Sequence, residues 1–223
     1  MGLSYTLWYT SVWGKLKTYE EKINAYNIPD SLLKNISTKD LVETCLNYPD
    51  IILLMSRDNI QQGYDILKPI FNGFSELEKR EDAGTELIKL YQNIDPAEIV
   101  NLKTPDDRGI FSFNLTFLEL LLAQKTILQD LSEKGRINLL SLSTSMYKKK
   151  ISIIKYYAIF GLTTPCLISG RLLEIQNSEL LNQLILNNPN IQMFLDRFFI
   201  TKEDDLDKII KAGLEYLQTK GYE

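Results

Sequence analysis

Glu119 is the carboxylate whose surroundings most favour catalysis. It lies within the apolar run of residues 117–122, and a carboxylate buried among such side chains has a raised pKa and could act as a general acid. Helical spacing nevertheless places Glu119 on one face with Ser112, Thr116, Ala123 and Thr126, which form the polar stripe of that helix. We therefore expect Glu119 to lie at the surface or to be capped, and not to be catalytic.

Histidine is absent from all 223 residues. This absence excludes a Ser-His-Asp triad, a Cys-His dyad, a histidine general base and a histidine metal ligand within the chain. An enzyme would have to use carboxylate, tyrosine, lysine, serine or cysteine side chains. Glycoside hydrolysis, for example, needs two acids about 5–10 Å apart across a cleft. A carboxylate-based, glycan-active hydrolase is therefore the enzymatic alternative.

The acidic and cysteine clusters do not predict a metal or a cofactor. Residues 203–207 carry four acids in five positions, but they lack an EF-hand pattern and suit the first turn of a helix, where the dipole favours negative charge. Residues 106–109 read as a turn. Cys45 and Cys166 form no C-x-x-C motif and sit among apolar neighbours, so we expect two buried small side chains. Whether they pair is left open.

Three adjacent lysines, Lys148 to Lys150, precede Lys155 and are flanked by Tyr147, Tyr156 and Tyr157. A basic patch with interleaved aromatic rings can bind phosphates or RNA. Adjacent helical positions diverge by about 100° each, so the three lysines spread around the helix, and we expect a solvated helix end. The formal net charge of -4 also disfavours nucleic acid as a partner.

The N-terminal segment holds both tryptophans of the chain and is the tentative partner-binding region. Trp8, Tyr9 and Trp13 lie close together there. Exposed aromatic clusters dominate interface energetics. The competing interpretation is that Trp8 and Trp13 pack the terminus onto neighbouring helices.

The aliphatic composition predicts an all-α fold. The chain contains 36 leucines and 25 isoleucines but only 3 valines. Leucine favours helices, whereas strands usually draw on valine. We expect an irregular multi-helix array or bundle of short helix pairs, with a solenoid-like arrangement left open, and no strand.

Apolar periodicity, capping residues and prolines predict where the helices lie. The predicted helix over residues 112–131 is the most hydrophobic, and we expect it to be central and nearly surrounded. Gly161 to Pro165 reads as a turn that opens the next helix. The predicted helices span residues 11–26, 30–36, 38–48, 50–55, 59–71, 74–80, 83–93, 112–131, 133–147 (possibly continuing to 157), 166–176, 178–186, 190–198 and 202–216.

These helices are expected to form one domain over residues 1–223, with a possible subdivision near the loop-like stretch 95–109. Residues 41–57 and 181–197 share six of seventeen positions, and both read as helix, Asn-x-Pro, helix. A helical repeat would produce this match. Chance similarity between leucine-rich helices broken by proline would also produce it, and both readings stay open.

Hydropathy predicts no membrane-spanning helix. The longest uncharged stretch, residues 156–170, is interrupted by Gly161 and Pro165 and falls short of the roughly 20 apolar residues that a span needs. No signal peptide is visible at the start of the sequence.

Several motifs together resemble a family of uncharacterised, all-helical and often exported proteins of gut-type bacteria. The motifs are Asn27-Ile28-Pro29, the capping segment from Ser37 to Leu41, Cys45 to Pro49, and Phe71-Asn72-Gly73-Phe74 with residues 79–82. They fall within residues 8–95. The resemblance implies a helical fold, no known activity and a precursor with a signal peptide that is missing here. It weakly favours a periplasmic, cell-surface or secreted protein over a cytoplasmic one.

These observations favour a non-catalytic helical protein with an interaction or scaffold role. Many short helix pairs offer grooves for a partner protein. The alternatives are the carboxylate-based hydrolase and a helical bundle that binds a lipid or small molecule in an apolar cavity. No cofactor is expected, and the oligomeric state is not predicted.

Overall fold

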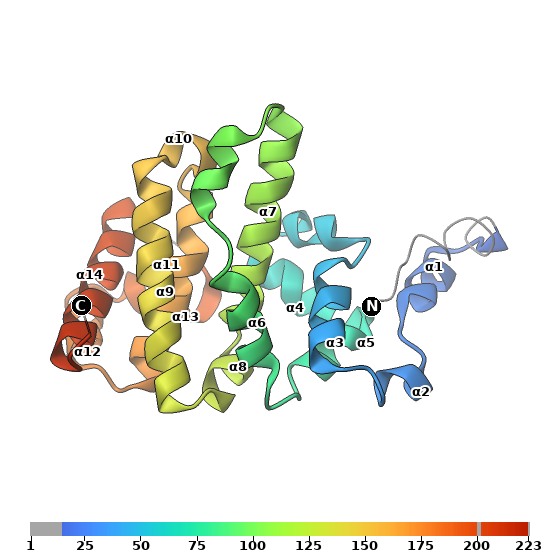
Figure 1. Cartoon of the computed structure of the whole chain (residues 1–223), viewed down its shortest axis with the longest axis horizontal. Coiled ribbons are helices and arrows are strands. Elements are labelled where there is room, and N and C mark those ends of the chain that lie inside the picture. The colour runs from blue at the N-terminus through green and yellow to red at the C-terminus, as the bar shows by residue number, and fades with distance from the viewer. Residues whose placement is uncertain (1–14, 200–201, 223) are drawn as a thin grey trace. The chain divides into compact units, whose positions relative to one another are not determined.

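The structure, a computed structural model, describes residues 15–199 and 202–222. The chain divides into two compact units, Met1–Glu86 (unit 1) and Leu87–Glu223 (unit 2). The described residues form helices and no strand (Figure 1), so the predicted all-α class is confirmed. Helix α6 (Ala83–Tyr91) contains the division between the units. The expected single domain, with a subdivision near 95–109, stays a prediction.

Unit 1 is a set of short helices around an aromatic core. Tyr48 stacks on Phe71 with ring centroids 4.7 Å apart, and Phe74 meets both rings edge to face. Gly63 lets a helix approach the backbone of Leu54 closely, because a Cβ at this position would overlap the Leu54 carbonyl oxygen. Before α6, the elements are α1 (Tyr19–Tyr26), α2 (Asp30–Leu33), α3 (Thr38–Leu46), η3 (Ile51–Ser56), α4 (Ile60–Ile70) and α5 (Asn72–Leu77).

Asn72 fixes the start of α5 against the segment that joins α1 and α2. The N–H of Ile28 donates to Asn72 Oδ1 over 2.9 Å, and Asn72 Nδ2 donates to the Ile28 carbonyl over 2.8 Å. The N–H of Asn72 donates in turn to Asn27 Oδ1. This side chain therefore replaces the backbone pairing that two loop segments lack.

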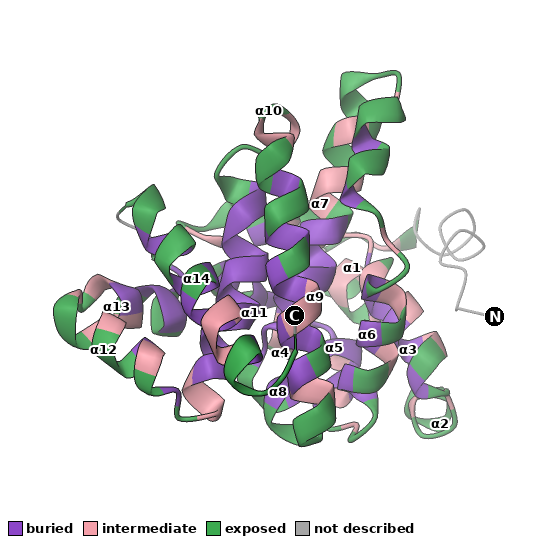
Figure 2. Cartoon of the chain, turned by 60° about the vertical axis from the view of Figure 1, so that its left-hand side comes forward, coloured by how far each residue is buried: buried purple, intermediate pink, exposed green. Residues whose placement is uncertain are grey.

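Unit 2 is built around α11 (Phe160–Ile175), in which every residue from Gly161 to Leu173 is buried (Figure 2). This helix packs against α9, α14 and α7. The other elements of the unit are η4 (Pro96–Asn101), α7 (Pro105–Leu122), α8 (Lys125–Asp130), α9 (Glu133–Ser152), α10 (Ile154–Tyr157), α12 (Glu179–Asn187), α13 (Asn190–Arg197) and α14 (Glu203–Thr219).

Two helices begin elsewhere than the periodicity predicts. The first described helix begins at Tyr19, because Thr18 caps it and Glu21 reaches back to the Thr18 N–H in a capping box. Part of the predicted helix, residues 11–14, lies outside the described residues. Helix α7 begins at Pro105, capped by Thr104, so the stretch predicted as a loop contains η4 and the first five residues of α7.

Two further predictions about helix continuity are wrong. The predicted helix 112–131 is two helices, α7 and α8, separated at Ala123 and Gln124. The predicted turn from Gly161 to Pro165 is helical, and Pro165 lies inside α11. In the described part of the chain, no helix is both long and apolar enough to cross a membrane.

Candidate functional site

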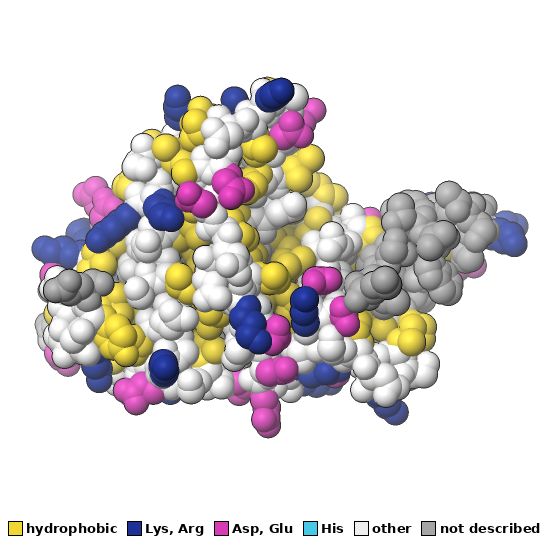
Figure 3. Space-filling view, in the orientation of Figure 1, with side chains coloured by type: hydrophobic (Ala, Val, Ile, Leu, Met, Phe, Trp, Pro, Cys, Tyr) yellow, Lys and Arg dark blue, Asp and Glu magenta, His cyan; other side chains and the backbone are white. Residues whose placement is uncertain are grey.

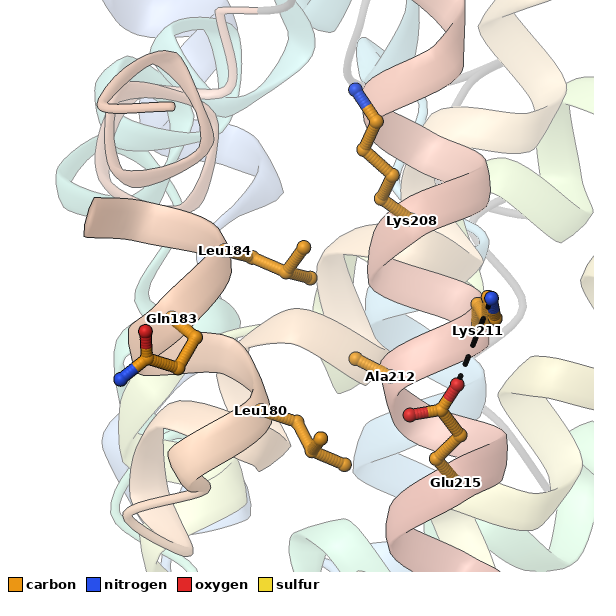
Figure 4. Close-up of a pocket in the computed structure, with 7 residues that line it drawn as sticks. All are labelled: Leu180, Gln183, Leu184, Lys208, Lys211, Ala212 and Glu215. Carbon is orange, nitrogen blue, oxygen red and sulfur yellow. Dashed lines mark ion pairs between the residues drawn. The ribbon is translucent and has the colours of Figure 1, made fainter. Parts of the chain in front are cut away.

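A groove of about 370 Å³ runs between α12 and α14 in unit 2 (Figure 4). Leu180 and Leu184 point from α12 toward α14, and Ala212 presents a small side chain between the two helices. The exposed lining is mostly apolar. The groove is lined by Leu180, Gln183, Leu184, Lys208, Lys211, Ala212 and Glu215.

Helical periodicity produces this groove. Leu180 and Leu184 are four residues apart, so they lie on one face of α12, whereas Leu181 faces inward and is fully buried. On α14, Leu206, Ile209, Ile210 and Leu217 are buried. Lys208, Lys211 and Glu215 stay on the outer side of the same helix. The groove therefore lies where the inward face of α14 gives way to its polar face.

The charges of the groove lie at its border. The side chains of Lys208 and Lys211 are 50% and 78% exposed. Lys208 Nζ is 3.4 Å from Asp205 Oδ1, and Lys211 Nζ is 3.9 Å from Glu215 Oε1. Such exposed pairs are weak and easily rearranged. Two ammonium groups can therefore turn toward an anionic group that enters the groove.

The chemistry of the groove suits binding. Glu215 is the one carboxylate among its lining residues, so the groove lacks the facing pair of acids that glycoside hydrolysis needs. Its floor is aliphatic, and its polar groups sit on long, exposed side chains. An amphipathic ligand could bury an apolar face on the floor and place polar groups at the border.

Glu119 and Lys150 form a second notable feature, a fully buried ion pair within unit 2. Both side chains are 0% exposed. Lys150 Nζ donates to Glu119 Oε1 over 2.8 Å and to Oε2 over 2.7 Å. Tyr91 donates to Oε1 over 2.9 Å, and Thr164 Oγ1 donates to Oε2. Each carboxylate oxygen thus accepts two hydrogen bonds.

Pro165 explains the third hydrogen bond of Lys150. In a regular helix the carbonyl of Gly161 would accept from the N–H of residue 165, but proline has no N–H. Lys150 Nζ donates to this carbonyl instead, over 2.9 Å. All three ammonium protons therefore have acceptors. The buried lysine satisfies both a buried carboxylate and a helix carbonyl that proline leaves open.

Burial lowers the pKa of Lys150, and the charge and hydrogen bonds of Glu119 oppose that shift. Burial and the Glu119 charge raise the pKa of Tyr91 well above its usual range. With both charged groups fully buried, a substrate cannot reach them. We therefore interpret the pair as a structural element of the α7–α9–α11 core.

This geometry corrects two expectations. Glu119 is neither exposed nor on a polar stripe, because the whole of residues 115–122 is buried, including Thr116. Lys150 is not part of a solvated helix end, although Lys148 and Lys149 are exposed. The pattern that could have identified the burial of Glu119 is the apolar run of residues 117–122 in which it lies.

The other predicted residues fall as follows. Glu203, Asp204 and Asp205 occupy the first turn of α14, as predicted. Cys45 and Cys166 are free and buried. Within residues 15–199 and 202–222, no cluster of His, Cys, Asp or Glu could hold a metal ion. Trp8, Tyr9 and Trp13, the tentative partner-binding residues, lie outside the described residues.

Sequence reasoning did not identify the groove residues. The amphipathic patterns of α12 and α14 were recognisable, but they specify only which face of each helix is apolar. The separation of the two helices depends on tertiary packing. The sequence contains one signal for the groove. Leu180 and Leu184 are four residues apart on a helix whose inward position is already filled by the buried Leu181.

Comparison of the chain with protein-family models, curated proteins and solved structures finds no match. The fold and the groove define the class, an all-α protein with a groove between two of its helices. The resemblance to exported helical proteins of gut-type bacteria stays a prediction, as does the compartment.

Proposed function

We propose that the chain is a non-catalytic interaction protein that binds an amphipathic helix of a partner protein in the α12–α14 groove. The observation that carries the proposal is the aliphatic floor of Leu180, Leu184 and Ala212 bordered by two exposed lysines. Helix-in-groove recognition uses such a floor for apolar anchors spaced three or four residues apart.

The dimensions of the groove suit a short helix. From Lys208 to Glu215 the lining of α14 covers eight residues, whose ends lie roughly 10 Å apart along the helix axis. About two helical turns of a partner can therefore lie along it. Leu180 and Leu184, one turn apart, would pack against two apolar anchors of the partner.

A helix fits the polarity of the groove better than a small molecule does. Pockets for small ligands usually contain a few fixed polar groups that orient the ligand. Here the polar side chains are long and exposed, and Gln183 points away from α14 in Figure 4. A helix satisfies its own backbone hydrogen bonds and needs only apolar contact from the floor. Acidic residues on its flank would then face Lys208 and Lys211.

The test is selection from a displayed library of random peptides of about 15 residues, roughly four helical turns. We expect selected peptides to contain leucine-like anchors at helical spacing together with glutamate or aspartate. Their binding should fall when Leu184→Glu blocks the floor and when Lys211→Glu reverses the charge at the border. Binding is measured by fluorescence anisotropy of the selected peptides.

Matched controls separate the groove from general effects. Leu186→Glu changes an exposed leucine of the same helix, and Lys134→Glu reverses an exposed lysine on α9. Both should leave binding unchanged. The proposal would be contradicted if the selected peptides bound the groove variants as tightly as the wild type, or if they were not enriched in glutamate or aspartate. Selection of no peptide, with an aliphatic fluorescent probe bound instead, would favour the small-molecule alternative.

A further inference from the structure

The connection from α9 through α10 to α11 exposes large apolar side chains at one end of unit 2, near the label α10 in Figure 1. Ile151 is 37% exposed, Ile159 is 43% exposed and Phe160 is 37% exposed. Three such side chains within ten residues form an apolar tip, the name used here for residues 151–160. Exposed apolar side chains that are bordered by polar ones are a common feature of interaction surfaces.

The backbone holds this tip in an unfavourable conformation. Ala158 has φ 50° and ψ -172°, a region that is occupied almost only by glycine. The two residues that follow it, Ile159 and Phe160, are both exposed. Strained backbone persists only where the surrounding structure enforces it, and it is concentrated at functional sites.

Basic side chains lie within and beside the apolar tip. The Lys155 ammonium lies 4.9 Å from the centroid of the Tyr156 ring, and the Arg108 guanidinium lies 5.2 Å from the same centroid. One ring thus holds two cations close together. Lys148 is exposed at the end of α9, and Lys149 pairs with Asp95. Figure 3 shows Lys and Arg side chains next to hydrophobic ones at this end.

The acidic groups near the tip include Asp95 and Glu98, whose charges both act on Tyr157, and Asp106 and Asp107 at the start of α7. Asp95 accepts from Lys149, and it also caps η4 through the Ala97 N–H. Asp107 accepts from Thr104 in the first turn of α7, beside Asp106. The helix N-terminus opposes the negative charge of these two aspartates. Lys148 and Lys155 are exposed, and together with Arg108 they supply the positive charge at this end of unit 2.

We propose that the apolar tip binds the surface of a lipid bilayer that contains anionic headgroups. Ile151, Ile159 and Phe160 would enter the boundary between headgroups and acyl chains, and the basic side chains would bind the anionic lipids. Interfacial segments combine these same two features. This inference concerns a different surface from the α12–α14 groove and does not depend on it.

The side chains favour a lipid surface over RNA. Single-stranded RNA is bound by exposed planar rings on which bases stack. At the tip, Tyr157 is buried and donates its hydroxyl to the Pro96 carbonyl, and the Tyr156 ring is already in contact with two cations. The exposed apolar groups are two branched aliphatic side chains and Phe160. These fit acyl chains better than bases.

The test is flotation of the full chain with vesicles of phosphatidylcholine alone or of phosphatidylcholine mixed with phosphatidylserine. We expect binding to the mixed vesicles, weakening with salt, and little binding to phosphatidylcholine. The double variant Lys148→Glu/Lys155→Glu should lower the partition coefficient at least about tenfold, because each basic residue near an anionic surface adds to the attraction. Ile159→Ser should also weaken binding.

A label reports insertion directly. Both native cysteines are buried, so an environment-sensitive dye attaches selectively at Ile159→Cys and detects the polarity around position 159. Its emission should shift to the blue with mixed vesicles, and a dye on Leu186→Cys should not respond. Lys134→Glu and Ile52→Ser, at exposed positions outside the tip, serve as unaffected controls. Circular dichroism confirms that each variant is folded.

Two results would overturn the inference. One is the absence of binding to mixed vesicles by the folded wild-type chain, whether or not it binds a poly-uridine RNA. The other is vesicle binding that the tip variants do not weaken and that leaves the dye at position 159 unchanged.

Discussion

The burial and the ion pair of an individual side chain in this protein can differ from those of its neighbours in the sequence. Lys150 follows two exposed lysines, yet its ammonium group lies between a carboxylate and a helix carbonyl. The direction of its side chain is decided by a proline fifteen positions further along the chain, which leaves the Gly161 carbonyl without a backbone donor. Buried charges of this kind are stable only while every partner is present.

At this scale we predict that Lys150→Met lowers the free energy of unfolding by about 3–5 kcal/mol, because it leaves the Glu119 charge buried without a counter-ion. The double variant Glu119→Leu/Lys150→Met should be less destabilised than Lys150→Met alone, since the orphaned charge is removed as well. Urea unfolding followed by circular dichroism measures both. Lys149→Met, at the exposed neighbouring position, is the control and should change little. A double variant as unstable as the sum of its single variants would contradict this interpretation.

Between elements, close approach of backbones decides the packing in unit 1. Helix α4 touches η3 at Gly63, where a Cβ would overlap the Leu54 carbonyl oxygen and lie 2.6 Å from the Leu54 Cα. Backbone atoms cannot move aside as a flexible side chain can. In contrast, a Cβ on Gly109 in α7 would meet nothing within 4 Å.

We predict opposite effects for the same substitution at these two glycines. Gly63→Ala should lower the free energy of unfolding by about 2–3 kcal/mol, because it forces α4 away from η3. Gly109→Ala should raise it by about 0.5–1 kcal/mol, because alanine loses less backbone entropy in a helix. Thermal and urea unfolding of both variants provide the comparison. Equal effects of the two substitutions would show that helix propensity, and not close approach, governs position 63.

Over the whole molecule, buried tyrosines link stability to alkaline pH. Burial raises the pKa of Tyr64 in unit 1, with Glu78 adding to the shift, and burial likewise raises the pKa of Tyr91, Tyr147 and Tyr157 in unit 2. Glu119 and Asp207 add to the shifts of Tyr91 and Tyr147. In the unfolded chain, tyrosine loses its proton near pH 10. The folded chain therefore binds more protons than the unfolded chain above that pH.

We predict that the urea midpoint falls as the pH rises above about 10, because stability from a group with a raised folded pKa is lost above its unfolded pKa. Lys150 affects the pH dependence of stability in the opposite direction, since burial lowers its pKa. It is a single group, whereas four buried tyrosines have raised pKa values. Absorbance at 295 nm should show these four tyrosines, of 12 in the chain, ionising only with unfolding. Ionisation of all 12 together near pH 10 in the folded chain would refute the prediction.

The sequence by itself determined the helical class and many helix ends. A composition rich in leucine and poor in valine predicts helices. A capping residue such as Ser37 or Ser132 acts within the first turn of its helix, so local chemistry suffices to predict where that helix begins. The acids in the first turn of α14 were predicted for the same reason. Features that depend only on a few neighbouring residues can be predicted from those residues alone.

Only the tertiary structure decided which polar groups are buried and where two helices leave a groove. Glu119 and Lys150 are 31 positions apart, and neither residue type reveals that the other will lie within 2.8 Å. By residue type alone, Pro165 favours the end or start of a helix. In the fold, Lys150 donates to the Gly161 carbonyl that proline leaves without a donor, and Pro165 lies inside α11. The groove likewise depends on the separation of α12 and α14. Long-range packing sets these features because burial and distance belong to the whole fold and not to any segment of the chain.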